Sequence, residues 1–263
     1  MASRADRERT IADLRTQIGR LERGSRLAAR RHTFLPFDVP DLDRRLPEGG
    51  LPLGALHEVV PGGRATEHGA ACVLFVSGIL ARLKGPVLWC LTSRDLFAPA
   101  LARVGLHPDR VLYAETWRDA EVLPVMEEGV RVPGLAGVVG EASRVSLIAS
   151  RRLQLAAETT GVTAFVLRRW RKDADPIGNG AGEGSAAVTR WRVTALPSAA
   201  LPTPGLGRPC WRVELTRCRG APAGSDLCGW TLEGCDEAGR LGLSAHLADG
   251  SRPQAPEERA ATG

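Results

Sequence analysis

The segment LPEGGLPLGALHEVV, residues 46–60, opens the part of the chain that decides the fold. Its Pro and Gly residues predict a turn over residues 46–54, and the apolar run that follows predicts a strand over residues 55–60. Four later apolar runs predict further strands, at residues 86–91, 110–114, 135–139 and 163–167. The stretches between them predict helices, at about residues 66–83, 96–104, 118–129 and 145–160. Because strands that alternate with helices of this length form parallel sheets with right-handed crossovers, the sequence predicts a doubly wound α/β domain.

The pattern changes after Leu167. Residues 168–187, RRWRKDADPIGNGAGEGSAA, hold four Gly and no apolar periodicity, which predicts a long loop of a kind that is usually functional or disordered. Three later segments alternate with a period of two and predict an antiparallel extension of the sheet, at residues 188–196, 209–218 and 227–234. We therefore expect an N-terminal helix over residues 1–32, an α/β core over residues 33–235 and an unstructured tail over residues 236–263.

The first segment carries the whole charge excess of the chain. Residues 1–31 hold nine Arg against four acidic residues, which accounts for the net charge of +5. One apolar stripe runs along this predicted helix, formed by Ile11, Leu14, Ile18 and Leu21. Such a stripe is suited to docking on a partner or to packing on its own domain, and the two interpretations stand level. The basic charge favours nucleic acid or an acidic partner, with a merely solvated helix as the alternative.

The two lysines exclude an ordinary nucleotide-binding loop. A P-loop needs Gly-Lys followed by Ser or Thr, because that Lys neutralises the phosphates that the loop N–H groups cradle. Here Lys84 follows Leu83 and Lys172 follows Arg171. The chain also lacks a G-x-S-x-G, H-E-x-x-H or G-x-G-x-x-G motif in the context such motifs need, so we expect neither a generic hydrolase site nor a dehydrogenase site, and no cofactor.

The six cysteines make no Cys-x-x-Cys pair, so reduced structural thiols are the favoured interpretation and a metal site is the minor alternative. The chain has no apolar run long enough to cross a bilayer and no secretory signal, from which we expect a cytoplasmic protein without membrane contact.

Trp89 and Phe75 lie in apolar runs and are expected in the core. His57 and Glu58 are neighbours on a strand, so they face opposite sides and cannot form an acid–base pair.

An ordered series of segments resembles the RecA recombinase core. The series comprises GGLPLGALHEVV (residues 49–60), VLWCLTSRDLFAPALARVGL (residues 87–106), a strand at Leu135 and the W-R-V-x-L-T-R strand at residues 211–217. It is most similar to the shorter RecA-like family called ImuA, the inducible mutagenesis protein A, over about residues 41–233. The resemblance implies a RecA-like, doubly wound, mostly parallel sheet with an antiparallel C-terminal extension.

At the P-loop position of the RecA type this chain reads VVPGGRATEHGAA, residues 59–71. Aligned without a gap, the phosphate-binding Lys falls on Glu67 and the magnesium-binding hydroxyl falls on His68. The resemblance places the catalytic Glu at Ser93 and the magnesium-linked Asp at Gly140, which is followed by Glu141. We therefore expect a pseudo-ATPase without catalytic residues, whose degenerate phosphate loop consists of Gly62, Gly63, Arg64, Thr66, Glu67 and His68. Weak anion binding by the N–H groups of this loop and a relic turn are both open interpretations.

The resemblance also matches the loop at residues 168–187 to a DNA-binding loop of RecA. The candidate residues for binding DNA or a partner are Arg168, Arg169, Trp170, Arg171, Lys172, Arg190, Trp191 and Arg192. Tryptophans stack on unpaired bases while arginines meet phosphates, and the same residue types also suit a protein interface. A protein partner is slightly favoured over single-stranded DNA.

Resemblance to ImuA implies an accessory protein of the SOS response to DNA damage that supports error-prone translesion synthesis. The implied partners are an ImuB-like inactive relative of the Y-family polymerases, RecA and an error-prone C-family DNA polymerase. The expected mechanism is that of an adaptor, which binds other molecules but forms and breaks no covalent bond. Two alternatives remain: an unconventional DNA-dependent ATPase of the RecA type, and a cell-division inhibitor of the SulA type.

Overall fold

The fold comes from a computed structural model of the chain, which describes residues 33–169, 184–198, 205, 207–221 and 228–243. Residues 1–33 and residues 34–263 form separate units by their contacts, and the described fold is that of the second unit. The helix predicted for residues 1–32, with Ile11, Leu14, Ile18 and Leu21, lies outside the described residues.

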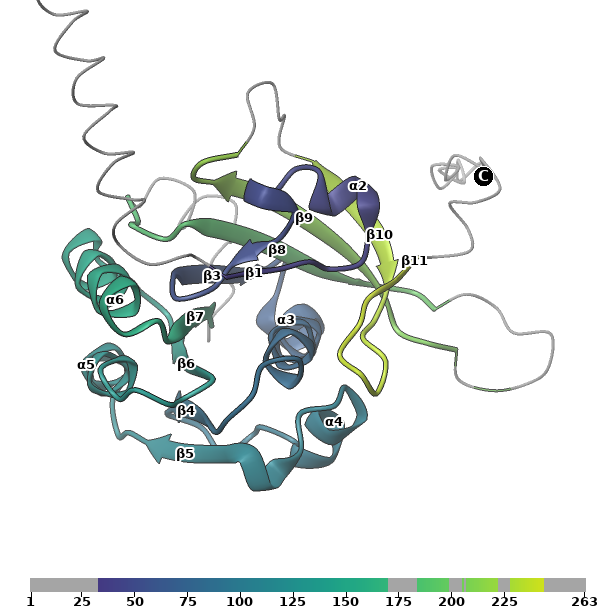
Figure 1. The fold of residues 1–263 in the computed structure, drawn as a ribbon. Helices are drawn as coiled ribbons and strands as arrows, with labels where there is room; N and C mark the ends of the chain where they lie inside the picture. The colour runs from purple at the N-terminus through teal and green to yellow at the C-terminus, as the bar shows by residue number, and fades with distance from the viewer. Residues whose placement is uncertain (1–32, 170–183, 199–204, 206, 222–227, 244–263) are drawn as a thin grey trace, which may run out of the picture. The chain divides into compact units, whose positions relative to one another are not determined.

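The centre of the fold is a mostly parallel sheet (Figure 1). Within the described residues it has nine strands, in the order β11-β10-β9-β8-β3-β7-β6-β4-β5. The mutually parallel strands are β3 (Leu56–Pro61), β4 (Val87–Leu91), β5 (Val111–Glu115), β6 (Gly137–Ala142), β7 (Thr163–Arg168) and β8 (Thr189–Leu196). This arrangement confirms the predicted α/β class with a mostly parallel sheet.

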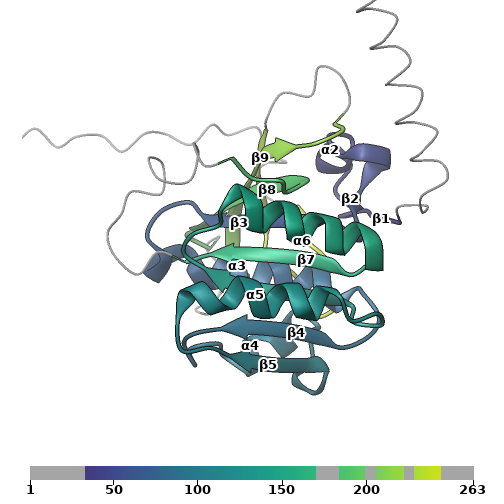
Figure 2. The ribbon, with the colours of Figure 1, turned by 90° about the vertical axis from the view of Figure 1, so that its left-hand side faces the viewer.

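Among the described residues, four helices connect parallel strands and lie on both faces of the sheet (Figures 1 and 2). One face carries α3 (Ala65–Ala81) and α4 (Ala98–Arg103), and the other carries α5 (Asp119–Val130) and α6 (Leu147–Thr160). Helix α6 begins at a Ser146 N-cap, whose Oγ accepts a hydrogen bond from the Ala149 amide, and ends at Gly161 with φ of 80°. Placing helices on both faces makes the sheet doubly wound.

The last strands run antiparallel: β9 (Cys210–Cys218) pairs with β8, β10 (Gly229–Glu233) pairs with β9, and β11 (Gly242–Leu243) pairs with β10. Residues 188–196, expected in the antiparallel part, form β8 at the junction of the two parts, because this strand is antiparallel to β9 on one side and parallel to β3 on the other. The core boundary expected at residue 235 is wrong. Leu241 is buried in the main core cluster and Asp236 caps a turn that leads into β11, while residues 244–263 lie outside the described part.

Shorter elements precede β3. Strand β1 (Phe34–Leu35) pairs with β2 (Leu51–Pro52), and between them lie α2 (Pro40–Asp43) and the 3-10 turn η1 (Pro47–Gly49). A second 3-10 turn, η2 (Pro108–Arg110), leads into β5. The turn predicted for residues 46–54 thus contains η1 and β2.

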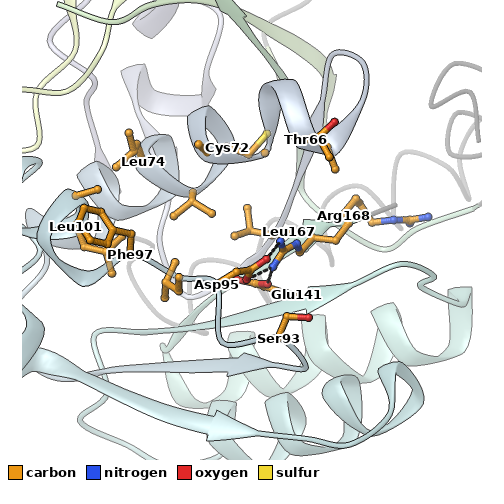
Figure 3. Close-up of a pocket in the computed structure, with 17 residues that line it drawn as sticks. Thr66, Cys72, Leu74, Ser93, Asp95, Phe97, Leu101, Glu141, Leu167 and Arg168 are labelled. Atoms are coloured by element: carbon orange, nitrogen blue, oxygen red, sulfur yellow. Dashed lines mark hydrogen bonds and ion pairs between the residues drawn. The ribbon is translucent and has the colours of Figure 1, made fainter. Parts of the chain in front are cut away.

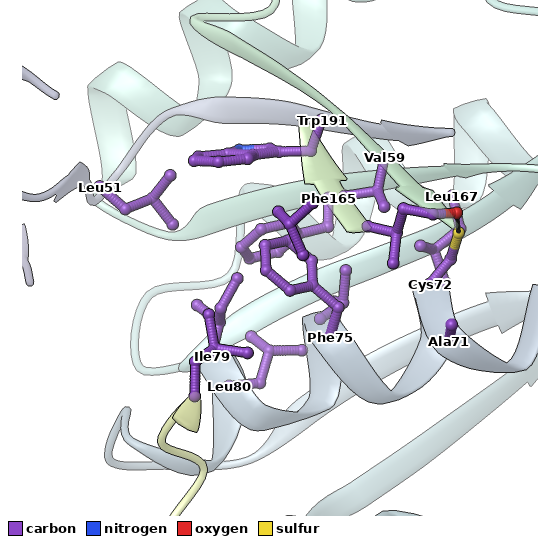
Figure 4. Close-up of a cluster of buried hydrophobic side chains, with 14 of the residues drawn as sticks. Leu51, Val59, Ala71, Cys72, Phe75, Ile79, Leu80, Phe165, Leu167 and Trp191 are labelled. Atoms are coloured by element: carbon purple, nitrogen blue, oxygen red, sulfur yellow. Dashed lines mark hydrogen bonds between the residues drawn. The ribbon is translucent and has the colours of Figure 1, made fainter. Parts of the chain in front are cut away.

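The largest core cluster lies between α3 and the sheet (Figure 4). Phe75, Phe165 and Trp191 are fully buried there, and the ring centroid of Trp191 lies 5.4 Å from that of Phe37 and 5.7 Å from that of Phe75. Trp89 is buried as well, so the core positions predicted for Trp89 and Phe75 are confirmed. In the described part of the chain, no helix is both long and apolar enough to span a membrane.

Candidate functional site

The segment predicted as a degenerate phosphate loop is a short link between β3 and α3, closed by a neighbouring strand. Three residues separate Pro61 at the end of β3 from Ala65 at the start of α3. The Gly62 amide donates a hydrogen bond to the Val193 carbonyl of β8 at 2.9 Å. A Cβ added to Gly62 would lie 1.7 Å from Oγ1 of Thr194. The loop therefore packs against β8, and its first amide is already used.

The two residues that the sequence alignment matches to the P-loop Lys and hydroxyl, Glu67 and His68, lie in the first turn of α3. The Glu67 side chain is 59% exposed, whereas His68 is mostly covered. The Nδ1 atom of His68 accepts a hydrogen bond from the Ala195 amide at 3.2 Å, which joins the first turn of α3 to β8. Arg64 is the N-cap residue of α3 and makes no side-chain cap. Thr66, the hydroxyl-bearing residue of the predicted phosphate loop, lies in the first turn of α3 and lines a cavity.

The cavity, of about 620 Å³, lies at the carboxyl ends of β4, β6 and β7 beside the start of α3 (Figure 3). In doubly wound folds ligands bind at this edge of the sheet. Its polar lining comes from Thr66, Ser93, Asp95, Glu141, Arg168 and Arg169, and its apolar wall includes Leu101 and Phe97 of the α4 region. Ser93, one of the two expected ATPase positions, therefore lines this cavity together with Thr66 and with Glu141, which follows the other expected position, Gly140.

Arg169 ties two carboxylates together in this cavity. Its Nη1 donates to Oδ1 of Asp95 at 2.8 Å and also contacts Oε2 of Glu141. The other oxygen of Glu141 accepts a hydrogen bond from Trp89 Nε1 at 2.8 Å. The hydrogen bond to Asp95, helped by Glu141, raises the pKa of Arg169 above its ordinary value. With two carboxylates and two guanidinium groups, the lining carries no surplus positive charge.

The structure corrects part of the predicted loop surface. Trp191 is fully buried, so the expectation that it stacks on bases is wrong. Arg190 is 12% exposed and its Nε donates to Oε2 of the buried Glu58 at 2.7 Å, so it does not face a ligand. Arg168 is buried as well. The physical reason is the alternation along the β strand, which turns Trp191 to one covered face and Arg190 to the other.

The remaining residues of the predicted loop surface differ in their surroundings. Arg192 is partly exposed and lies 3.9 Å from Glu214 of β9, and Arg169 is held in the cavity. Trp170, Arg171 and Lys172 lie outside the described residues. The return limb of the loop is anchored, because Ser185 contacts Glu58 and the Ala186 amide donates to Ser150 Oγ at 3.0 Å.

Two residues of this region were missed by the sequence analysis. Asp95 follows β4, and an acidic side chain just after a parallel strand is a signal that could have indicated it. Thr194, which closes the phosphate loop, carries no such signal, because its role depends on the register of β8 against β3.

Comparison with known proteins gives two curated relatives and two structures of lower similarity. No protein-family model matches the chain. Two curated proteins, both named Protein ImuA and both from strains of Caulobacter vibrioides, are 41% identical over 230 residues, which are 82% of this chain and 90% of each relative. Among solved structures, SulA from Pseudomonas aeruginosa is 21% identical with a TM-score of 0.37, covering 44% of this chain and 98% of its own. A KaiC-like protein from Pyrococcus horikoshii is 12% identical with a TM-score of 0.48, covering 81% of this chain and 99% of its own.

Proposed function

The chain belongs to the ImuA family, and on that premise we propose that it acts as a non-catalytic adaptor in error-prone translesion synthesis. Because the chain is a member of the ImuA family, it has a role in damage-inducible mutagenesis. The adaptor function goes further: this chain joins other proteins of the pathway and performs no chemistry of its own.

The closed phosphate loop is the observation that carries this proposal. A P-loop needs four residues between its first Gly and the Gly-Lys pair to wrap around a phosphate. Here three residues link β3 to α3, the Gly62 amide is bound to Val193, and Thr194 lies against Gly62. Glu67 adds a carboxylate at the Lys position, which repels phosphate. Both the shape and the charge of the loop argue against nucleotide binding.

The cavity supports the same conclusion. Arg169, the cation that faces Asp95 and Glu141, already bonds to both carboxylates, so its charge is compensated within the protein. Glu141 is buried and holds Trp89 Nε1 with its other oxygen, which leaves it poorly placed to orient a water molecule. Ser93 offers a hydroxyl where a general base needs a carboxylate or imidazole.

For the partners we propose the ImuB-like inactive polymerase relative, RecA and the error-prone C-family polymerase. Protein contact takes precedence over single-stranded DNA in this proposal, because Trp191 and Arg190 are used inside the fold. The apolar stripe of Ile11, Leu14, Ile18 and Leu21 is the proposed docking element within residues 1–32.

The direct test is pulldown of each purified partner with the full chain and with a variant that lacks residues 1–31. We expect at least one partner to bind the full chain and to bind the truncated chain more weakly. In parallel, equilibrium binding of a fluorescent ATP analogue and DNA-stimulated ATP hydrolysis are measured on the full chain, and we expect neither. Binding to none of the three proteins contradicts the adaptor function. Saturable ATP binding with hydrolysis, lost on changing Gly63 or Arg64, would establish the ATPase alternative.

A further inference from the structure

Helix α6 has a second apolar face that points to solvent. Its inner face packs on α5, β3 and β7 through buried residues such as Leu153 and Ala157. On its outer face Ile148 is 73% exposed and Leu155 is 63% exposed. Figure 2 presents α5 and α6 side by side on the near side of β7. Because the two aliphatic side chains are seven residues apart, they lie on one face, about 10 Å apart along the helix axis.

Arginines flank these two apolar side chains. Arg151 and Arg152, three and four residues after Ile148, are exposed on the same side of the helix. Within the described part of the chain, no carboxylate lies within ion-pair distance of Arg151. Arg152 shares a single carboxylate, Glu127, with Arg131 of the α5 end, at 2.8 Å and 2.6 Å. Positive charge therefore exceeds negative charge over the first two turns of α6.

Glu127 is held firmly between the two guanidinium groups. Burial raises the pKa of this carboxyl, but the hydrogen bonds from Arg131 and Arg152 outweigh burial and leave the pKa below its ordinary value. At the far end of the helix, the acidic Glu158 accepts a hydrogen bond from Gln154 Nε2 at 2.6 Å. The acidic side chains near this face are thus bonded within the protein, and the basic half of the helix remains open to a partner.

A shallow groove continues the apolar face toward α5. It has a volume of about 270 Å³ and is lined by Leu155, Ala156 and Thr159 of α6 together with Glu127 of α5 and Arg131, which follows α5. Two neighbouring helices with a groove between them form a seat for the apolar stripe of a third helix.

We propose that the outer face of α6, formed by Ile148, Arg151, Arg152 and Leu155, docks an amphipathic helix of a partner protein that carries Asp or Glu beside its apolar stripe. The inference rests on the proposed adaptor function and names the chemistry of one partner. The spacing of the aliphatic residues matches anchors at i and i+7 of a bound helix, and the arginines complement acidic flanks. Nucleic acid fits this face less well, because bases stack on aromatic rings and this face offers aliphatic side chains.

The experiment measures the affinity of the full chain for each of the three candidate partners, by titration at several salt concentrations. The test variants are Ile148→Glu, Leu155→Glu and Arg151→Glu. The controls are Leu112→Glu and Trp117→Ala, which change exposed apolar residues on and after β5. We expect each test variant to weaken the binding of one and the same partner about tenfold or more, and the controls to leave that affinity within about twofold. Arg151→Gln is expected to reduce the salt dependence of binding.

Because all five positions are exposed, thermal unfolding of the variants is expected to match that of the unchanged chain, and this is measured for each. As a second readout, a photoreactive benzoylphenylalanine at position 148 is irradiated in the complex and the cross-linked peptide is sequenced. We expect an acidic amphipathic helix of the affected partner.

The outcomes separate the two proposals. If the unchanged chain binds none of the three proteins, the adaptor function itself fails. If it binds and the α6 variants bind equally well, or if the controls reduce binding instead, the α6 inference is overturned while the adaptor function stands. Cross-linking to a basic peptide or to nucleic acid also overturns it.

Discussion

Oγ1 of Thr194 on β8 lies 1.7 Å from the point where a Cβ on Gly62 would stand. Gly62 follows β3 directly, and its amide donates to the neighbouring Val193 carbonyl. In a nucleotide-binding loop glycines allow the backbone to approach phosphate. Here the missing side chain allows β8 to approach the loop, so the glycine serves the packing of two strands.

Gly62→Ala is therefore expected to destabilise the fold. The added methyl group overlaps Thr194, and overpacking of this kind costs roughly 1–3 kcal/mol of the free energy of unfolding. The matched control is Gly69→Ala in α3, where the nearest atom is 4.0 Å from the added Cβ and helix propensity favours Ala by about 1 kcal/mol. Unfolding in urea measures the free energy of unfolding of both variants. The close packing is refuted if Gly62→Ala is as stable as the unchanged chain; Thr194→Ala in the same chain should recover part of the loss.

Glu67→Lys is expected not to create a nucleotide site. The substitution restores the charge of the P-loop Lys but leaves the three-residue loop bonded to β8. Binding of a fluorescent ATP analogue should stay as weak as for the control Glu67→Gln. Tight, saturable binding by Glu67→Lys alone would mean that charge, and not loop geometry, is what prevents nucleotide binding.

Arg190→Ala is expected to cost stability. The substitution removes the guanidinium that bonds Oε2 of the completely buried Glu58, and removing one partner of a buried ion pair costs about 3 kcal/mol or more. The control is Arg212→Ala on β9, whose ion pair with Glu214 at 3.5 Å is exposed and worth under about 1 kcal/mol. The free energies of unfolding of the two variants are compared by chemical denaturation. Equal stability of the two variants would contradict a structural role for Arg190.

The stability of the fold should fall on mild acidification because of His57. This fully buried ring donates from Nε2 to the Pro52 carbonyl at 2.9 Å and accepts at Nδ1 from Thr189 Oγ1 at 2.8 Å, so it is held neutral. Burial lowers the pKa of His57 from 6.5 to about 4. The unfolded state therefore binds a proton first, and stability present above pH 6.5 is lost as the pH falls toward 4.

Between pH 7 and pH 5 this group contributes a loss of about 2 kcal/mol in the free energy of unfolding. The measurement is denaturant unfolding at both pH values, for the unchanged chain and for His57→Gln. The variant should be less stable at pH 7 and should lose less stability between the two values. If both chains lose the same amount, His57 does not titrate as its burial requires.

Local sequence pattern was enough to predict most of the parallel sheet and its helices. Strands such as Val87–Leu91 and helices such as Leu147–Thr160 begin and end within a few residues of the expected positions, because each carries its own apolar periodicity. The expectations failed where contacts between residues distant in the sequence determine the structure. Leu241 belongs to the core because β11 returns to β10, and β8 has a parallel neighbour besides the antiparallel β9 because it also pairs with β3.

By itself the sequence determined the chemical identity of the residues that follow β3: Glu67 and His68 are present and no Lys is, and no arrangement of the chain changes that. Only the tertiary structure decided which basic and aromatic residues are available to a partner. Arg190 and Glu58 are 132 residues apart and meet because their strands pair in one register. Alternation along β8 indicates that Arg190 and Trp191 face opposite sides, but what covers each side depends on the packing of distant elements.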